Sequence, residues 1–258
     1  MKKIILFVLL LFCASLMANY AVQSRESLTL AAADLKALRI DCGAGYLKIQ
    51  GVDGLEQIEV SAVLDVRGIA DNELAAFKKE YVTLKLEKVA AKAELTARIE
   101  SGFSLASLFG DNHDARIDLD IRVPRRLALA IDDGSGDVDI SDSDGNLKLE
   151  DGSGDIRLTN IRGQVSIDDG SGDMILAKIN GMLQIEDGSG DIELNDTGND
   201  VAIDDGSGEI RLNRTLGSVT VDDGSGDIVI DGVEKDVTID EAGSGGVKIR
   251  NVKGKVKK

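Results

Sequence analysis

Residues 186–194 read Glu-Asp-Gly-Ser-Gly-Asp-Ile-Glu-Leu, and close copies of this stretch follow one another from residue 132 to residue 245. The central serine returns every eighteen residues without an insertion. The serines are Ser135, Ser153, Ser171, Ser189, Ser207 and Ser225. A fixed period of this kind predicts one structural unit stacked on copies of itself, so the repeat determines the architecture before any local propensity is considered.

Each copy contains two short alternations of apolar and polar residues. When the first glycine of Gly-Ser-Gly is position one, positions five, seven, fourteen and sixteen are apolar in every full copy, as in Ile192, Leu194, Val201 and Ile203. This alternation predicts two short strands, each with one buried face. Gly-Ser-Gly forms one turn between them, and a looser stretch that often holds Gly or Asn forms the other.

Position six helps to distinguish coils from hairpins, because equivalent positions of a solenoid stack about 4.8 Å apart in ladders. This position faces outward and places acid beside base at two steps, Asp139 with Arg157 and Glu193 with Arg211. Ladder stacking favours such neighbours. We therefore predict an all-β protein, a parallel β-solenoid with 18-residue coils and two main sheets. An antiparallel meander of hairpins remains the alternative.

The first residues predict export. Lys2 and Lys3 precede an uninterrupted apolar run at 4–12 and a small-residue stretch ending at Ala18. This pattern is typical of a secretory signal peptide at residues 1–18, and the run is short for a membrane anchor. A lipid anchor on Cys13 is an alternative, which the bulky residue before that cysteine disfavours. The mature chain then has no transmembrane segment and belongs to the periplasm, the cell surface or the medium.

The rest of the chain divides into three predicted parts. Residues 19–66 hold strands and a first, degenerate coil around Cys42, residues 67–124 form a strand and helix insertion, and residues 125–258 form the repeat solenoid. Without the signal peptide Cys42 is the only cysteine, so no intramolecular disulfide forms, and we expect it to pack in a turn. The solenoid interior is filled almost wholly by Ile, Leu and Val, because no aromatic residue follows Asp132.

The insertion carries its own pattern. Strands are expected at 58–66, 82–87, 93–99 and 117–123, and a short helix at 71–81, capped by Asp71, with Leu74, Phe77 and Tyr81 on one face. An apolar loop at 101–110 is bounded by glycines. Either it covers one end of the solenoid core, or it contacts a membrane or a partner. Its contact candidates are Phe103, Leu105, Leu108 and Phe109.

The order of these motifs resembles a known family. The stretch 40–45 (Ile-Asp-Cys-Gly-Ala-Gly), the alternating strands with a short helix, Ile-Arg-Val-Pro at 121–124 and the repeated Ser-Gly-Asp-Ile-x-Leu are similar to the bacterial putative-adhesin family of exported β-strand-repeat proteins, a family of unknown function. The resemblance covers nearly all of the mature chain. It implies an envelope or surface location, with some relatives linked to envelope stress, and it supplies no functional residues.

The repeat lacks the groups that the catalytic sites it resembles would need. A serine triad needs a base, and the only histidine, His113, lies outside the array. Asp196-Thr197-Gly198 matches one half of an aspartic-protease site, but a second such triplet is missing. The turn is a poor phosphate cradle, since a carboxylate follows it and no helix does. We predict no enzyme. A polysaccharide-acting β-helix is the remaining catalytic alternative, disfavoured because no copy carries a distinctive catalytic group.

Calcium is the one metal that the repeat suggests, although we assign no residue as its ligand. Acids flank each turn on both sides, and stacked acids repel one another. Calcium could relieve this repulsion with oxygen ligands from adjacent turns, as in calcium-binding β-rolls. The alternative is that the acids accept hydrogen bonds from turn amides while solvent screens the rest. The calcium candidates are Asp151, Asp155, Asp169, Asp173, Asp187 and Asp191.

The formal net charge of −16 restricts the partners. It disfavours nucleic acid and anionic lipid, which need a basic surface, and it favours cationic peptides or envelope polymers. We therefore predict a noncatalytic, exported structural or interaction module of the bacterial envelope, adhesive or related to envelope stress. A calcium-binding β-roll-like module is the alternative. No cofactor is predicted, and the sequence leaves the oligomeric state open.

Overall fold

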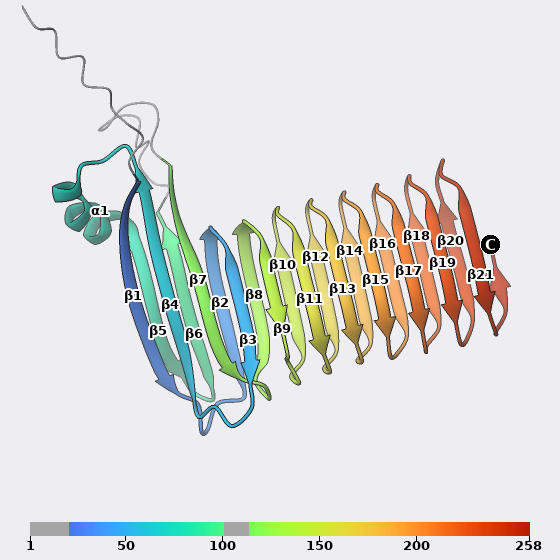
Figure 1. Cartoon of the computed structure of the whole chain (residues 1–258), viewed down its shortest axis with the longest axis horizontal. Helices are drawn as coiled ribbons and strands as arrows, with labels where there is room; N and C mark the ends of the chain where they lie inside the picture. Colours follow the sequence, from blue (N-terminus) through green and yellow to red (C-terminus); the bar gives the residue numbers. More distant parts are fainter. Residues whose placement is uncertain (1–20, 101–113) are drawn as a thin grey trace, which may run out of the picture.

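The computed structural model describes residues 21–100 and 114–258, and these form a long rod of two facing sheets (Figure 1). The predicted signal peptide, the apolar loop at 101–110 and His113 lie outside the described residues. Each sheet has eleven strands within the described ranges. Eighteen-residue coils wind between the two sheets, so the predicted all-β parallel solenoid is confirmed and the antiparallel meander is wrong for the repeat.

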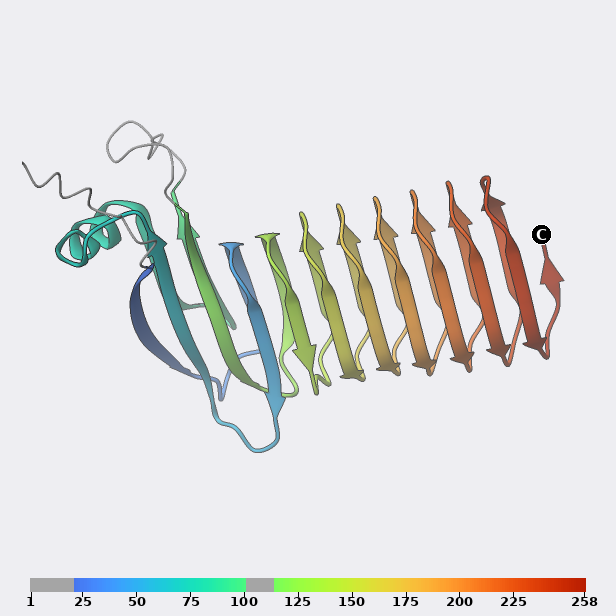
Figure 2. The same ribbon diagram turned by 45° about the horizontal axis from the view of Figure 1, so that its top comes forward.

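The repeat supplies alternate strands to the two sheets. Figure 2 shows the coils following one another at even spacing to the C-terminal end. In sheet A the strands are β9 (Val138–Ser141), β11 (Ile156–Ile161), β13 (Met174–Ile179), β15 (Ile192–Thr197), β17 (Ile210–Thr215), β19 (Ile228–Val233) and β21 (Val247–Val252). In sheet B they are β8 (Ala128–Ser135), β10 (Leu147–Asp151), β12 (Val165–Asp169), β14 (Leu183–Asp187), β16 (Val201–Asp205), β18 (Val219–Asp223), β20 (Val237–Ala242) and β22 (Val256–Lys257).

The register of the ladders equals the sequence period. Ile192 pairs with Ile210 in sheet A, and Val201 pairs with Val219 in sheet B, each eighteen residues on. The position-six neighbours are also in register, Arg157 with Asp139 and Glu193 with Arg211. Their side chains form no salt bridge with each other among the described residues, and Arg211 instead pairs with Glu209. The predicted stacking of position-six residues is confirmed. The acid and base at these steps do not, however, stabilise the ladder through salt bridges with each other.

The N-terminal part continues both sheets in a different way. Its elements are β1 (Ala21–Ala31), β2 (Ala37–Ala44), β3 (Leu47–Val52), β4 (Gln57–Arg67), the 3₁₀ turn η1 (Asp71–Glu73), α1 (Leu74–Tyr81), β5 (Val82–Val89), β6 (Lys92–Ile99) and β7 (Ala115–Pro124). Strands β2 and β3 pair in parallel with β8 and β9, as one more coil. Beyond them β1, β4 and β7 run antiparallel in sheet A, and β5 and β6 do so in sheet B.

The short helix starts differently from its prediction. Asp71 does not cap it, because the helical turn begins at Asp71 itself and Ala70 is the N-cap residue. The backbone N–H of Ala70 donates to Glu73 Oε2 at 2.8 Å, so an acid three residues later satisfies the helix start. Of the predicted apolar face, Phe77 and Tyr81 are buried and Leu74 is partly buried against the core. No helix in the described ranges is long and apolar enough to cross a membrane.

Candidate functional site: the acidic edge of the solenoid

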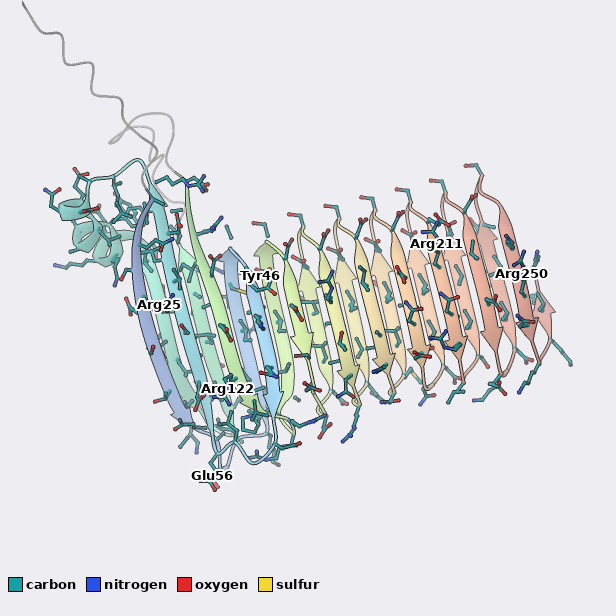
Figure 3. All side chains as sticks on the ribbon, viewed as in Figure 1. Arg25, Tyr46, Glu56, Arg122, Arg211 and Arg250 are labelled. Carbon is teal, nitrogen blue, oxygen red and sulfur yellow. The ribbon has the colours of Figure 1, made fainter. Side chains whose placement is uncertain are left out.

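The Gly-Ser-Gly turns form one long edge of the rod, where sheet B passes into sheet A. In Figure 3 this edge is marked by red oxygen atoms that recur from coil to coil. Two glycines with positive φ show why the second glycine of the turn tolerates no side chain. A Cβ at Gly172 (φ 144°) would overlap the carbonyl oxygen of Gly154, and one at Gly190 (φ 148°) would overlap that of Gly172. The repeated glycines therefore let successive turns approach closely and bring their acids into line.

Three rows of carboxylates run along this edge, and each row takes one acid from each of six successive coils. The inner row consists of Asp133, Asp151, Asp169, Asp187, Asp205 and Asp223. The sheet row, just before it in sequence, consists of Asp132, Glu150, Asp168, Glu186, Asp204 and Asp222. The turn row, after the turn, consists of Asp137, Asp155, Asp173, Asp191, Glu209 and Asp227.

The inner row points into the protein. Along β10 the residues at Leu147, Leu149 and Asp151 are buried while those between them are exposed, so the aspartate continues the apolar face. All six members are more than nine-tenths buried, down to 0% exposed at Asp223. They stack in register, Asp169 on Asp151 and then each on the next coil. The interior, expected to be filled almost wholly by Ile, Leu and Val, therefore also contains a line of carboxyl groups.

Five of the six inner carboxyl groups, those from Asp151 to Asp223, accept a hydrogen bond at one oxygen only. The backbone N–H of Ser189 donates to Asp187 Oδ1 at 3.1 Å, and the coils from Asp151 to Asp223 repeat this contact at 2.9–3.3 Å. The Oδ2 atoms of all six, and Oδ1 of Asp133, are buried without a hydrogen-bond partner among the described residues. The expectation that solvent screens these acids is wrong for the inner row, because the period-two alternation turns them inward.

Burial and mutual repulsion shift the acidity of this row. Two like charges about 4.8 Å apart repel by roughly 3 kcal/mol at an effective dielectric near 20. Burial first, and the charge of the preceding inner-row aspartate second, raise the pKa of Asp151, Asp169, Asp187 and Asp205 to about 6, against an ordinary value of 3.8. Burial also raises the pKa of Asp133 to about 6, and that of Asp223 in the same direction.

A thiol stands at the N-terminal end of the inner row. Cys42 is buried in β2 and pairs in register with Asp133, so it occupies the place of an aspartate in the preceding coil. Burial, followed by the charge of Asp133, raises the pKa of the Cys42 thiol. At the other end Ala242 is the register partner of Asp223. Cys42 therefore packs in the interior, but within strand β2 and not in a turn as expected.

The other two rows lie outside. In the turn row, Asp173 Oδ1 accepts a hydrogen bond from the backbone N–H of Asp191 at 3.0 Å, and four further turns repeat this contact between coils. The sheet row faces out from sheet B. Glu150 pairs with Lys148, and Asp132 pairs with Arg98 at 3.3 Å. Asp168, Glu186, Asp204 and Asp222 form no salt bridge within the ranges that the structure covers.

The calcium candidates fall into two different environments. Asp151, Asp169 and Asp187 belong to the buried inner row, whereas Asp155, Asp173 and Asp191 belong to the exposed turn row. Within residues 21–100 and 114–258, no group of three His, Cys, Asp or Glu side chains is placed to hold a metal ion. The described residues therefore offer no ready-made cage, and calcium binding stays an untested prediction. The contact candidates from Phe103 to Phe109 are outside the described residues.

The fold and this edge together define a repeat protein, a parallel β-solenoid with an acidic flank. A family model described as Toastrack DUF4097 matches residues 47–228. The chain belongs to this family, in line with the resemblance drawn from its motifs. No protein with a curated description matches the sequence.

Several solved structures are similar along most of the chain. A "putative adhesin" from Bacteroides fragilis is 13% identical with a TM-score of 0.40, covering 91% of this chain and 96% of that one. A "putative cell adhesion protein" from Clostridium sporogenes is 13% identical with a TM-score of 0.32, covering 91% and 98%. A "putative lipid binding protein" from Parabacteroides distasonis is 14% identical with a TM-score of 0.33, covering 91% and 97%.

Proposed function

We propose that this protein is a noncatalytic, exported interaction module of the bacterial envelope, and that it holds cationic peptides or polymers along the acidic flank of its solenoid. The pattern of residues 1–18 supports export. The sameness of the coils supports a binding role, because catalysis needs one copy to differ in chemistry, whereas a linear ligand can use many equal contacts.

The observation that carries the proposal is the sheet row. Its middle and C-terminal members, Asp168, Glu186, Asp204 and Asp222, are exposed and face the same way from neighbouring strands. Five steps of about 4.8 Å make the full row about 24 Å long. An extended ten-residue peptide reaches about 33 Å, so one such peptide can follow the whole row. Adhesion to a cationic surface would use the same contacts.

The test compares two variants that each lose four negative charges. The row variant carries Asp168→Asn, Glu186→Gln, Asp204→Asn and Asp222→Asn. The control variant carries Asp34→Asn, Asp53→Asn, Asp71→Asn and Asp114→Asn, which are exposed acids of the N-terminal part. Binding of fluorescent decalysine is measured by anisotropy at low salt and at physiological salt, where distant charges are screened.

The row variant is expected to bind decalysine at least about tenfold more weakly than the unmodified protein, because it loses local charge complementarity. The control variant should change the Kd by less than about threefold, since its net charge is the same but its sheet row is intact. Equal weakening in both variants would mean that net charge alone attracts the peptide, and the acidic flank would then lose its assigned role.

A further inference from the structure

The inner row has a property that partner binding does not use. Six aspartates lie in the interior, in register, with Oδ2 atoms that meet no donor in the described part of the chain. A buried carboxylate without a partner is costly, and a neighbouring carboxylate makes it costlier. A proton removes the charge and also provides the missing donor. With a rung spacing of about 4.8 Å, a protonated Oδ2 can donate along the row to the carboxyl group of the next coil.

We propose that the inner row is a proton-sharing ladder that makes the solenoid a pH-responsive rod, closed along its turn edge when the rungs hold protons and loosened there when the rungs ionise. The ladder carries one rung per coil from Asp133 to Asp223. Ionisation of one rung disfavours ionisation of the next, so the row titrates as a coupled set. The Gly-Ser-Gly turns beside it are the places where a coil opens first, because they contain no apolar side chain.

The charged groups around the ladder are nearly all acids. From sheet B the neighbouring members of the sheet row, Asp132, Asp168 and Asp222, add negative charge, and from the turns the turn-row acids Asp137, Asp173 and Asp191 do the same. Within the described residues, a cationic side chain influences the ladder only at its N-terminal end. There Arg98 favours the ionised form of Asp133. The uncharged thiol of Cys42 faces that same rung.

The direction of the pH dependence follows from these surroundings. The inner-row pKa values of about 6 lie above the ordinary value of 3.8 that the unfolded chain takes. The folded protein therefore binds more protons than the unfolded chain between these two values. The stabilisation is fully present below about 3.8 and is lost as the pH rises through about 6. Most folded proteins with paired carboxylates show the opposite trend in this range.

The first test measures the melting temperature of the full protein between pH 4.5 and pH 7.5. A fall on the order of 5 °C or more is expected as the pH rises. The ladder variant carries Asp169→Asn, Asp187→Asn and Asp205→Asn, which keep the shape and supply a neutral donor. It should lose about half of the slope, because three of the six rungs are removed, and it should melt higher than the unmodified protein at pH 7.5. The control variant carries the adjacent exposed changes Asp168→Asn, Glu186→Gln and Asp204→Asn, and should keep the slope.

The second test uses the unmodified protein, so it does not depend on whether the ladder variant folds. Carboxyl ¹³C chemical shifts of selectively labelled aspartate follow each titration directly. Several aspartates titrating near pH 6 support the ladder, and ordinary titration of every aspartate overturns it. An unchanged melting slope in a folded ladder variant overturns it as well. The melting series is repeated with calcium and with chelator at matched ionic strength. If calcium replaces the effect of protons, the ladder takes a metal and the proposal falls.

Discussion

Asp65 in the antiparallel strand β4 and Asp187 in the inner row of the solenoid are both buried aspartates on sheet strands, but their surroundings differ. Asp65 is 6% exposed, and Gln23 Nε2 donates to its Oδ2 at 2.8 Å from the neighbouring strand β1. Asp187 is 7% exposed, and its Oδ2 meets no donor among the described residues. The strands of the N-terminal part do not repeat one another in sequence. A neighbouring strand can therefore place a hydrogen-bond donor opposite one buried acid.

The repeated part cannot solve the problem in this way. A coil that repeats every eighteen residues places the same group opposite itself, so an acid faces an acid at each step. When such a stack is buried and has no other donors, it is stable only with an added proton or cation, or with a residue that both donates and accepts. In the repeat, the missing donor of one buried carboxyl group recurs in every coil of the row, so the protonation of these groups becomes coupled.

Substitution of a turn glycine should have the largest effect. Gly190→Ala places a Cβ against the carbonyl oxygen of Gly172, at a φ of 148° that L-residues rarely adopt. We expect a loss of about 3 kcal/mol or more in the free energy of unfolding, measured by urea denaturation. Gly43→Ala, at the first glycine of the corresponding turn in the N-terminal coil, meets no heavy atom within 4 Å and should cost less than about 1 kcal/mol. The glycine at the position of Gly190 in that turn is Gly45, which is itself closely packed. Equal costs would show that the turns are not closely packed.

Removal of the satisfied acid should have an intermediate effect. Asp65→Ala leaves the Gln23 amide without its acceptor and empties a buried position, so a loss of about 1–2 kcal/mol at neutral pH is expected. By contrast, Asp187→Asn should raise stability at pH 7.5. Urea denaturation of both variants at that pH measures the two signs. Destabilisation by both substitutions would contradict the distinction between a satisfied and an unsatisfied buried acid.

A hydroxyl pair within the repeat offers a smaller test. Thr197 and Thr215 are buried in register, and their Oγ1 atoms lie 2.7 Å apart. A hydroxyl both donates and accepts, so this stack satisfies itself without a proton. Thr215→Val should cost about 1 kcal/mol, because the Thr197 hydroxyl then loses its partner. The double change to valine matches the aliphatic neighbours Ile179 and Val233 and should recover most of this loss in a double-mutant cycle.

Much of the fold was predictable from the sequence, because the same pattern of strands and turns recurs in every copy of the repeat. The eighteen-residue period, the two strands per coil, the inserted strands and the helix near Phe77 all follow from alternation and glycine placement. Strand β1 was not predicted. Its signal is weak, since the inner face carries polar residues between Val22, which is buried, and Leu28 and Leu30, which are partly exposed. A non-repeating edge strand is specified by its partner β4 more than by its own residues.

The inner row was missed for a different reason. The sequence analysis treats its acids and the turn-row acids as one charged turn, because a sequence shows the charge of a side chain more clearly than the side of the strand on which it lies. The signal was present in the alternation: Asp187 lies two residues after Ile185 and four after Leu183, in phase with the buried face. Phase along a strand therefore predicts burial better than residue type does. The missing Oδ2 donors, in contrast, depend on three-dimensional contacts that no spacing reveals.

The position of a rung along the ladder should produce the smallest of these effects. Asp187 stands between two acids of the inner row, Asp169 and Asp205, whereas Asp223 has Asp205 on one side and Ala242 on the other. Asp187→Asn should raise the free energy of unfolding at pH 7.5 by about 1 kcal/mol, and Asp223→Asn by less, because it relieves repulsion from one neighbour only. Urea denaturation at pH 5 and pH 7.5 measures the difference. Equal gains would mean that each rung responds to its own burial alone, and the ladder would then be a set of independent acids.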